Sequence, residues 1–217
     1  MNYIRENHES VPMRKYAAIV IALILLAGPN VRGDEWPVPT VQNIFSDNGR
    51  FFVRLVPGTR PYENECGARG TPESAGNARG QFYAQDGDRG FRLVADVELR
   101  NPVSPVYAVV TNSGNLVTFD NWYCMGYGDT IAVYESAGTL VRSIPLSELY
   151  PSTFSAIPRS KSGLLWRCSV RVSPSPDPGT ITVFDHGGGT FIVDGRTGRF
   201  EYRPGTAACQ PRSWQMF

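Results

Sequence analysis

A glycine turn recurs three times along this chain, each time between two runs of strand-forming residues. The segments SDNG, TNSG and PDPG end at Gly49, Gly114 and Gly179, and these glycines are 65 residues apart both times. Glycine adopts positive φ at little steric cost, and the tight turns of β-hairpins require that conformation. The recurrence therefore predicts antiparallel hairpins at regular intervals and an all-β fold.

A second glycine turn follows each first one, and another β-branched or aromatic run comes after it. These later turns lie at residues 86–90, 136–138 and 194–198. Each unit then reads strand, turn, strand, connection, strand, turn, strand. The sequence predicts three four-stranded antiparallel meander units, at about residues 41–99, 106–145 and 164–203. Helix signals are few, and only residues 145–150 predict a short helix.

These units resemble the blades of β-propellers, where one short polar-glycine turn joins two strands and a second joins the outer pair. The likeness covers residues 41–203, and the segment 182–198 looks most like a blade. Propellers close with four or more blades, so three units imply an open or partial propeller. Its sheet edges would need covering or pairing with another chain, which includes self-association. A β-sandwich is the alternative architecture.

The N-terminal part predicts export. A basic cluster at 13–15 precedes the uncharged apolar run 16–27, whose helical length of roughly 18 Å is well below the roughly 30 Å bilayer core. This pattern is typical of a secretory signal peptide, and we expect cleavage before Asp34, with Met13 as an alternative start. An uncleaved membrane anchor is the other interpretation. Residues 34–217 then form a single domain in the periplasm, in the envelope or outside the cell.

The chain is also similar to exported bacterial proteins of unknown function that carry a Phe-Asp-Asn-Trp…Gly-Tyr-Gly-Asp segment, here residues 119–122 and 126–129. That resemblance implies a compartment and no chemistry. The formal net charge is +1, so neither a nucleic-acid surface nor a polybasic membrane patch is expected.

The four cysteines are Cys66, Cys124, Cys168 and Cys209. An even number behind an export signal favours disulfides. No CxxC pair occurs, and His186 is the one histidine after the signal segment, so we expect neither a metal nor a cofactor. Three pairings are open. The blade resemblance favours Cys124–Cys168, because neighbouring blades would bring their segments side by side, and it leaves Cys66–Cys209 as the second pair.

The stretch FDNWYCMGYGDTIAVYE, residues 119–135, carries the densest group of reactive side chains. We place its segment 120–129 in the connection between two strands. A nucleophilic Cys124 would need a base, and His186 is more than sixty residues away, so no catalytic residue is expected. A calcium site would need several oxygen ligands from this connection, and its spacing fits no EF-hand.

Six residues are candidates for binding. Aromatic side chains near strand ends can line a surface that binds a peptide or carbohydrate, or they can cover a sheet edge. Acidic and amide side chains can form hydrogen bonds that fix a loop or bind a ligand. The candidates are Asp120, Asn121, Trp122, Tyr127, Asp129 and Trp166. The basic residues around Trp166 are interpreted as a solvated face.

The sequence therefore predicts a non-catalytic exported domain that binds a protein, peptide or glycan, or that has a structural role in the envelope. The rival hypothesis is a hydrolase, for example one similar to a glycosidase, using Asp120, Asp129 and Asp185. A glycosidase needs two carboxylates facing each other across a cleft. No GxSxG elbow, HExxH helix, Walker loop or dinucleotide fingerprint occurs in the sequence. A membrane contact is expected only through an uncleaved anchor.

Overall fold

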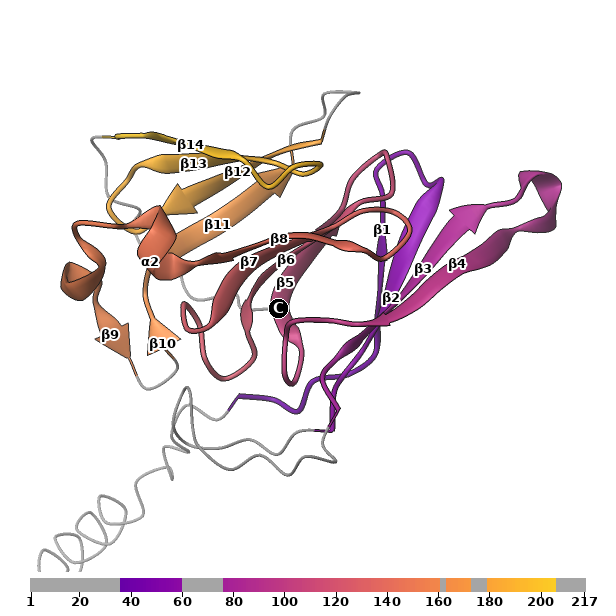
Figure 1. The fold of residues 1–217 in the computed structure, drawn as a ribbon, viewed down its shortest axis with the longest axis horizontal. Coiled ribbons are helices and arrows are strands. Elements are labelled where there is room, and N and C mark those ends of the chain that lie inside the picture. The colour runs from indigo at the N-terminus through magenta and orange to yellow at the C-terminus, as the bar shows by residue number, and fades with distance from the viewer. Residues whose placement is uncertain (1–35, 60–75, 161–162, 173–178, 206–217) are drawn as a thin grey trace, which may run out of the picture. The chain divides into compact units, whose positions relative to one another are not determined.

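The computed structural model of the chain describes residues 36–59, 76–160, 163–172 and 179–205 (Figure 1). In these residues every pairing between named strands is antiparallel, and one short α-helix and two 3-10 turns accompany the strands, so the predicted all-β class is confirmed. The predicted signal segment, Cys66 and Cys209 lie outside the described residues.

Three sheets have four strands each, and in each sheet the strand order follows the sequence. The first meander consists of β1 (Gln42–Phe45), β2 (Phe51–Val56), β3 (Arg79–Gln85) and β4 (Phe91–Glu98). The second consists of β5 (Pro105–Val110), β6 (Leu116–Asn121), β7 (Asp129–Tyr134) and β8 (Leu140–Pro145). The third consists of β11 (Arg167–Val172), β12 (Thr180–Asp185), β13 (Thr190–Asp194) and β14 (Phe200–Arg203). The three meanders match the predicted units closely.

The predicted glycine turns fall where the strands reverse. Gly49 lies between β1 and β2 at φ 67°, Gly114 between β5 and β6 at φ 86°, and Gly198 between β13 and β14 at φ 68°. These left-handed conformations favour glycine, as the pattern required. Most of the turn before Gly179 lies outside the described residues.

The chain after β8 is the main exception to the β pattern. Helix α2 (Leu146–Leu149) follows Pro145 directly and buries both of its leucines, and the 3-10 turn η2 (Phe154–Ala156) comes after it. A two-stranded sheet of β9 (Arg159–Ser160) and β10 (Gly163–Leu164) precedes the third meander. The short helix expected in this region is confirmed.

The central strands β6 and β7 of the second meander are buried on both faces, because their neighbouring residues alternate between two hydrophobic clusters. On β6, Val117 and Phe119 belong to one cluster and Leu116 to the other, and all three are fully buried. The first cluster also contains Ile181, Val183, Phe191 and Val193 of the third meander. The second contains Val53, Leu55 and Phe82 of the first meander. The second meander therefore supplies core to both of its neighbours in the sequence.

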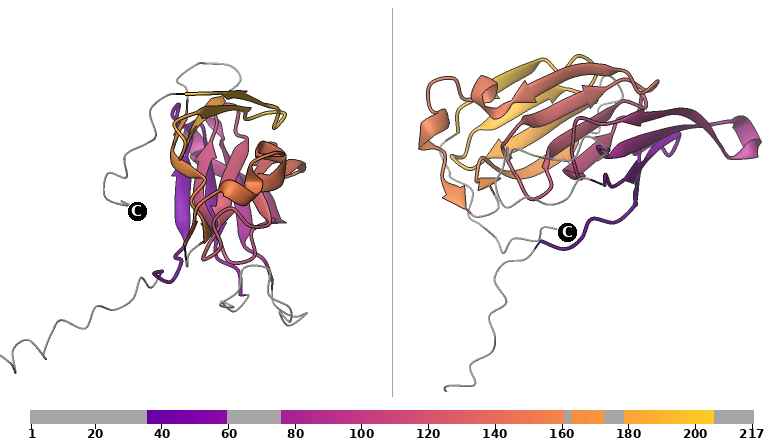
Figure 2. Two further views of the ribbon diagram at one scale, coloured as in Figure 1. Left: turned by 90° about the vertical axis from the view of Figure 1, so that its left-hand side faces the viewer. Right: turned by 60° about the horizontal axis from the view of Figure 1, so that its bottom comes forward.

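The described strands form four separate sheets, and their order does not close into a barrel (Figures 1 and 2). The β3–β4 hairpin projects beyond the other strands of its sheet and ends at the 3-10 turn η1 (Gly87–Arg89). Strand β4 pairs only with β3 among the described strands, so it is an edge strand.

Candidate functional site

Asp120 is the centre of the acidic and aromatic stretch. It lies in β6 rather than in the predicted connection, it has a φ of 58°, and its side chain is fully buried. Its Oδ1 accepts hydrogen bonds from the backbone N–H of Gly126 at 2.8 Å and from Nε1 of Trp166 at 2.7 Å. Its Oδ2 accepts one from Nε of Arg167 at 2.6 Å. The carboxylate thus holds its own loop against the start of β11.

The ion pair between Asp120 and Arg167 is shielded from water. The Arg167 side chain is 11% exposed, and its guanidinium lies 5.9 Å from the centroid of the Trp166 ring. Removing one member of such a pair leaves an uncompensated buried charge and is strongly destabilising. This arrangement indicates a structural role for Asp120.

The loop after Asp120 is held by hydrogen bonds among its own residues. Nδ2 of Asn121 donates to the carbonyl of Tyr127 at 2.7 Å, and the N–H of Cys124 donates to the carbonyl of Asn121 at 2.8 Å. Tyr123 has a φ of 68°, an uncommon conformation for a bulky residue. These bonds fix the loop, which fits the prediction of a strongly specified connection.

The other two acids of the hydrolase hypothesis are also held by donors. Oδ2 of Asp129 is 2.8 Å from Nε of Arg100, and the Asp129 side chain is 25% exposed. Asp185 is buried; its Oδ1 accepts from the N–H of Gly189 at 2.6 Å, and its Oδ2 accepts from the hydroxyl of Tyr202 at 3.0 Å. All three carboxylates therefore serve contacts within the fold.

The predicted tryptophans lie in the interior. Trp122 is 4% exposed and Trp166 is 1% exposed, so in this structure neither ring presents a face to a ligand. The structure does bring the candidates together in part, since Trp166 donates to Asp120 and Asn121 donates to Tyr127. The contacts favour the structural interpretation, and a role in binding stays a prediction.

Two of the four cysteines belong to the described residues. Neither Cys124 nor Cys168 is a free thiol. A reactive Cys124 paired with His186 is therefore not supported. The pairing of Cys124 with Cys168 stays a prediction, as does that of Cys66 with Cys209.

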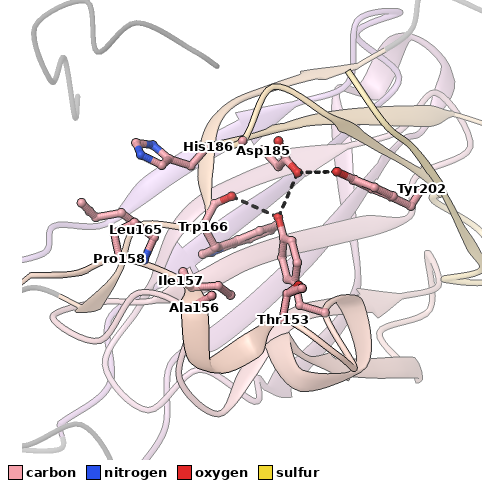
Figure 3. A pocket seen from close by; sticks show the side chains of 11 residues that line it. Thr153, Ala156, Ile157, Pro158, Leu165, Trp166, Asp185, His186 and Tyr202 are labelled. Atoms are coloured by element: carbon pink, nitrogen blue, oxygen red, sulfur yellow. Dashed lines mark hydrogen bonds between the residues drawn. The ribbon is translucent and has the colours of Figure 1, made fainter. Parts of the chain in front are cut away.

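A pocket of about 240 Å³ lies between the α2–η2 segment and the third meander (Figure 3). One side carries Asp185 and Tyr202, whose hydrogen bond is visible in Figure 3. The hydroxyl of Tyr150 lies 3.3 Å from the carbonyl oxygen of Trp166 and 3.4 Å from Asp185 Oδ2, so its one proton is shared between these two acceptors. Burial, followed by the nearby Asp185 carboxylate, raises the pKa of Tyr150, and burial also raises the pKa of Tyr202.

The opposite side of the pocket is apolar, and the complete lining joins segments that are far apart in sequence. The lining residues are Tyr150, Thr153, Ala156, Ile157, Pro158, Leu165, Trp166, Asp185, His186, Gly187 and Tyr202. The sequence did not predict this pocket. Three of its lining residues, Trp166, Asp185 and His186, were considered there only as a binding candidate, a possible catalytic acid and a possible base. No spacing pattern links Tyr150 to Tyr202, because the contact depends on how the segment after β8 folds back.

An exposed aromatic row crosses the first meander. Phe45 of β1 is paired with Phe52 of β2, Phe52 with Tyr83 of β3, and Tyr83 with Leu93 of β4. Adjacent rings stack, with centroids 4.9 Å apart for Phe45 and Phe52 and 4.4 Å apart for Phe52 and Tyr83. Phe91 packs edge-on against Phe52 at 4.9 Å. We call these five residues the aromatic row.

The aromatic row lies on the face opposite the core. Val53 and Phe82, the neighbours of Phe52 and Tyr83 along their strands, point into the hydrophobic cluster and are almost fully buried. Phe45 is 53% exposed, and Phe91 and Leu93 of β4 are also exposed. Sequence reasoning did not identify this surface.

In the part of the chain that the structure describes, no group of three or more His, Cys, Asp or Glu side chains is placed to hold a metal ion. The helices there are too short or too polar to cross a membrane. No protein-family model matches the sequence, and the comparison with curated proteins finds no match.

Proposed function

We propose that this chain is a non-catalytic exported β domain that binds another protein through the aromatic row of its first meander. The aromatic row carries this proposal, because it is a continuous apolar surface that spans all four strands and faces away from the core. Contiguous exposed apolar surface of this kind marks interaction sites. Aromatic residues are also enriched in the buried centre of protein interfaces.

The ring geometry favours a protein over a glycan. The Phe52 and Tyr83 rings are nearly parallel, with 4° between their planes, so each covers a face of the other. A sugar that binds by stacking needs an open ring face, whereas a protein partner can pack apolar side chains against ring edges and Leu93. The row is therefore better suited to side chains than to a sugar ring.

A polar border lies beside the aromatic row on the same sheet. Gln81 is paired with Asp96, and Nε2 of Gln81 donates to Asp96 Oδ2 at 3.1 Å. Nε of Arg79 donates to Asp96 Oδ1 at 2.9 Å. An apolar centre with a polar rim is the usual composition of a protein interface.

The enzyme alternative receives no comparable support. Asp120, Asp129 and Asp185 are each occupied by donors within the fold. A glycosidase needs two carboxylates free to act on opposite sides of one sugar bond. The held carboxylates favour binding over hydrolysis.

We also propose that the three meanders are blade-like units of an open or partial propeller. The shared strand order supports this, as does the packing of the second meander against both others. Export remains part of the proposal and rests on the basic cluster and apolar run before Asp34.

The proposal is tested by capture from the envelope fraction of the cells that produce the protein. The mature chain is compared with a Phe45→Ser/Leu93→Ser double variant. A Leu140→Ser/Val141→Ser variant is the matched control, since these β8 residues are 39% and 43% exposed but lie outside the row. We expect the same partner protein with the wild type and the control, and its loss with the row variant. Capture that is unchanged by the row variant would contradict the proposal.

A further inference from the structure

We propose that the partner protein adds a fifth strand to the first meander, by pairing an extended segment with the outer edge of β4. This inference rests on the proposed function, because it states how the partner meets the aromatic row at the point where the row reaches the edge of its sheet. It goes further by naming the conformation of the bound segment and the pattern of its side chains.

The first half of β4 is an exposed strand edge. Phe91, Arg92, Leu93 and Val94 are all exposed. In the described residues β4 pairs only with β3, and no backbone hydrogen bond joins residues 91–94 to any other segment. In an antiparallel sheet, every second residue of an edge strand directs its N–H and C=O away from the sheet. This half of β4 therefore presents backbone groups that a further strand can bind.

Other strand edges have neighbours beyond their own sheet. Strand β1 lies against β5, and Nη1 of Arg142 on β8 donates to the carbonyl of Gly198 at 3.1 Å. The second half of β4 is close to the β7–β8 turn, since a Cβ on Gly138 would lie 2.9 Å from Val97 Cγ1. The first half belongs to the hairpin that projects beyond the sheet (Figures 1 and 2). Its position leaves room for a strand from another protein.

The sequence of β4 does little to prevent such pairing. Edge strands are often protected by lysine or proline, and residues 91–98 contain neither. Irregular pairing also protects an edge, but here the irregularity lies beyond Leu93, where the register with β3 shifts. From Phe91 to Leu93 the pairing with β3 is regular. This regular segment is the one that we assign to the partner.

The backbone groups select an extended segment as the occupant. A helix bonds its own N–H and C=O groups internally, so it has none to offer along a strand edge. An added strand supplies these groups in register with the edge. Peptides that join a sheet in this way gain affinity from main-chain hydrogen bonds and specificity from alternate side chains.

The side chains of β4 predict the composition of the added strand. Phe91 and Leu93 belong to the aromatic row, so apolar residues opposite them would extend the row by one strand. Arg92 lies between them, and its neighbours on β3, residues 83–85, carry no charge. An acidic residue opposite Arg92 would supply a charge partner across the new pair. We therefore expect an apolar, acidic, apolar pattern in the bound segment.

Peptide titrations of the mature chain, followed by two-dimensional amide NMR, test the pairing. The probe is the capped heptapeptide Lys-Thr-Val-Glu-Val-Thr-Lys. One counterpart carries N-methyl groups on both valines, and the other carries them on the glutamate and the second threonine. Because alternate amides of a strand point in opposite directions, only one of these sets can bond β4.

The parent peptide should cause saturable shifts that are largest at the amides of residues 91–94. One methylated counterpart should bind within a few-fold of the parent. The other should bind about tenfold more weakly or worse, because it lacks the N–H groups that face β4. Equal binding of the two counterparts, equal loss of both, or no saturable shift with the parent would each overturn the proposal.

Charge reversal assigns the binding to the edge. Arg92→Glu should weaken binding of the parent peptide several-fold, and a peptide with lysine in place of glutamate should bind this variant better than it binds the wild type. Arg199→Glu makes the same change at an exposed residue between β13 and β14, and it should leave binding unchanged. The same response in both variants would contradict pairing at β4.

Capture from the envelope fraction separates this inference from the proposed function. Phe45→Ser changes the aromatic row on β1, at the opposite edge of the sheet from β4, whereas Arg92→Glu leaves the row intact. Loss of the captured protein with both variants supports the added strand. Loss with Phe45→Ser alone would keep the proposed function and overturn the added strand. Self-association of the chain that Arg92→Glu abolishes would also overturn it, because a second copy would then occupy the edge.

Discussion

Arg167 donates from Nε to Oδ2 of Asp120 over 2.6 Å, and this buried ion pair connects β11 with β6 across 47 residues of sequence. The same carboxylate accepts from Trp166 and from the backbone of Gly126. The reactive-looking stretch around Asp120 is thus explained as a junction between the second and third meanders.

Replacing Asp120 tests this junction. Asp120→Ala leaves the Arg167 guanidinium buried without its partner, and we expect unfolding free energy to fall by about 3–5 kcal/mol. Urea unfolding followed by circular dichroism gives the value. Asp129→Ala removes a more exposed pair with Arg100 and should cost only about 0.2–1 kcal/mol. Similar losses in the two variants would contradict the structural role.

Two glycines of the same loop should differ in their tolerance of alanine. Gly126 has a φ of 75°, and an added Cβ would lie 2.9 Å from both Leu146 Cδ2 and Leu164 Cβ. Gly128 has a φ of 67°, and its nearest contact would be Asn121 Nδ2 at 3.2 Å. The left-handed conformation costs alanine about 1 kcal/mol at either position, and overpacking adds about 1–3 kcal/mol at Gly126.

Thermal unfolding of Gly126→Ala and Gly128→Ala measures this difference. The first variant should melt at a clearly lower temperature than the second. An equal shift in the two melting temperatures would mean that the packing around Gly126 is looser than described.

The cysteines should resist alkylation in the native protein. Neither Cys124 nor Cys168 is a free thiol, so we expect iodoacetamide to modify them only after reduction and unfolding. Peptide mapping without reduction then identifies the partners, and the sequence favours a peptide joining Cys124 to Cys168. A Cys124 peptide linked to Cys66 or Cys209 would refute that pairing, and rapid native alkylation of Cys124 would refute the disulfide itself.

Stability should fall at alkaline pH. Burial raises the pKa of Tyr134 from 10.0 to about 12, and its hydroxyl accepts from the N–H of Arg100 at 2.7 Å. The folded state then keeps a proton that the unfolded state has lost, so unfolding free energy is unaffected below pH 10 and decreases as the pH rises towards 12. The decrease is on the order of 3 kcal/mol for this group.

Tyr134→Phe is the matched variant for the alkaline measurement. It removes the titrating hydroxyl, so its unfolding free energy should start lower and decline less steeply between pH 10 and about 12. Tyr150 and Tyr202, whose pKa values are also raised, account for the slope that remains. Parallel curves for the wild type and the variant would contradict the assignment to Tyr134.

The hairpins could be predicted from sequence because their signals are local. One polar residue after Gly49 and one after Gly114, an apolar strand-forming run begins, and both turns occur where the pattern placed them. The bounds of β6 were harder to predict, since Asp120 extends it at a φ of 58° and two of the three donors to its carboxylate are distant in sequence. Trp166 and Arg167 donate to its carboxylate, and no local pattern connects these residues to Asp120.

The aromatic row and the pocket could not be predicted from the sequence, because both depend on which distant segments lie side by side. Phe52 and Tyr83 become neighbours only through the register of β2 and β3, and Leu93 joins them only after an irregularity in the pairing of β3 with β4. Tyr150 reaches Asp185 because the segment after β8 folds back to the third meander. The pattern around Trp122 and Trp166 is compatible with a ligand surface or with a covered sheet edge, whereas both rings lie in the interior.

Site-specific photocrosslinking tests the central claim, that the domain binds a protein through the aromatic row, most directly. A photoreactive phenylalanine analogue is introduced at Leu93, which is 46% exposed in the row, and in a separate variant at Val141, which is 43% exposed on β8. Both variants are expressed in the cells that produce the protein, irradiated and analysed by mass spectrometry. We predict a crosslink from position 93 to one partner protein and none from position 141. Equal crosslinking at both positions, crosslinks only to a second copy of the chain, or none at position 93 would contradict the account.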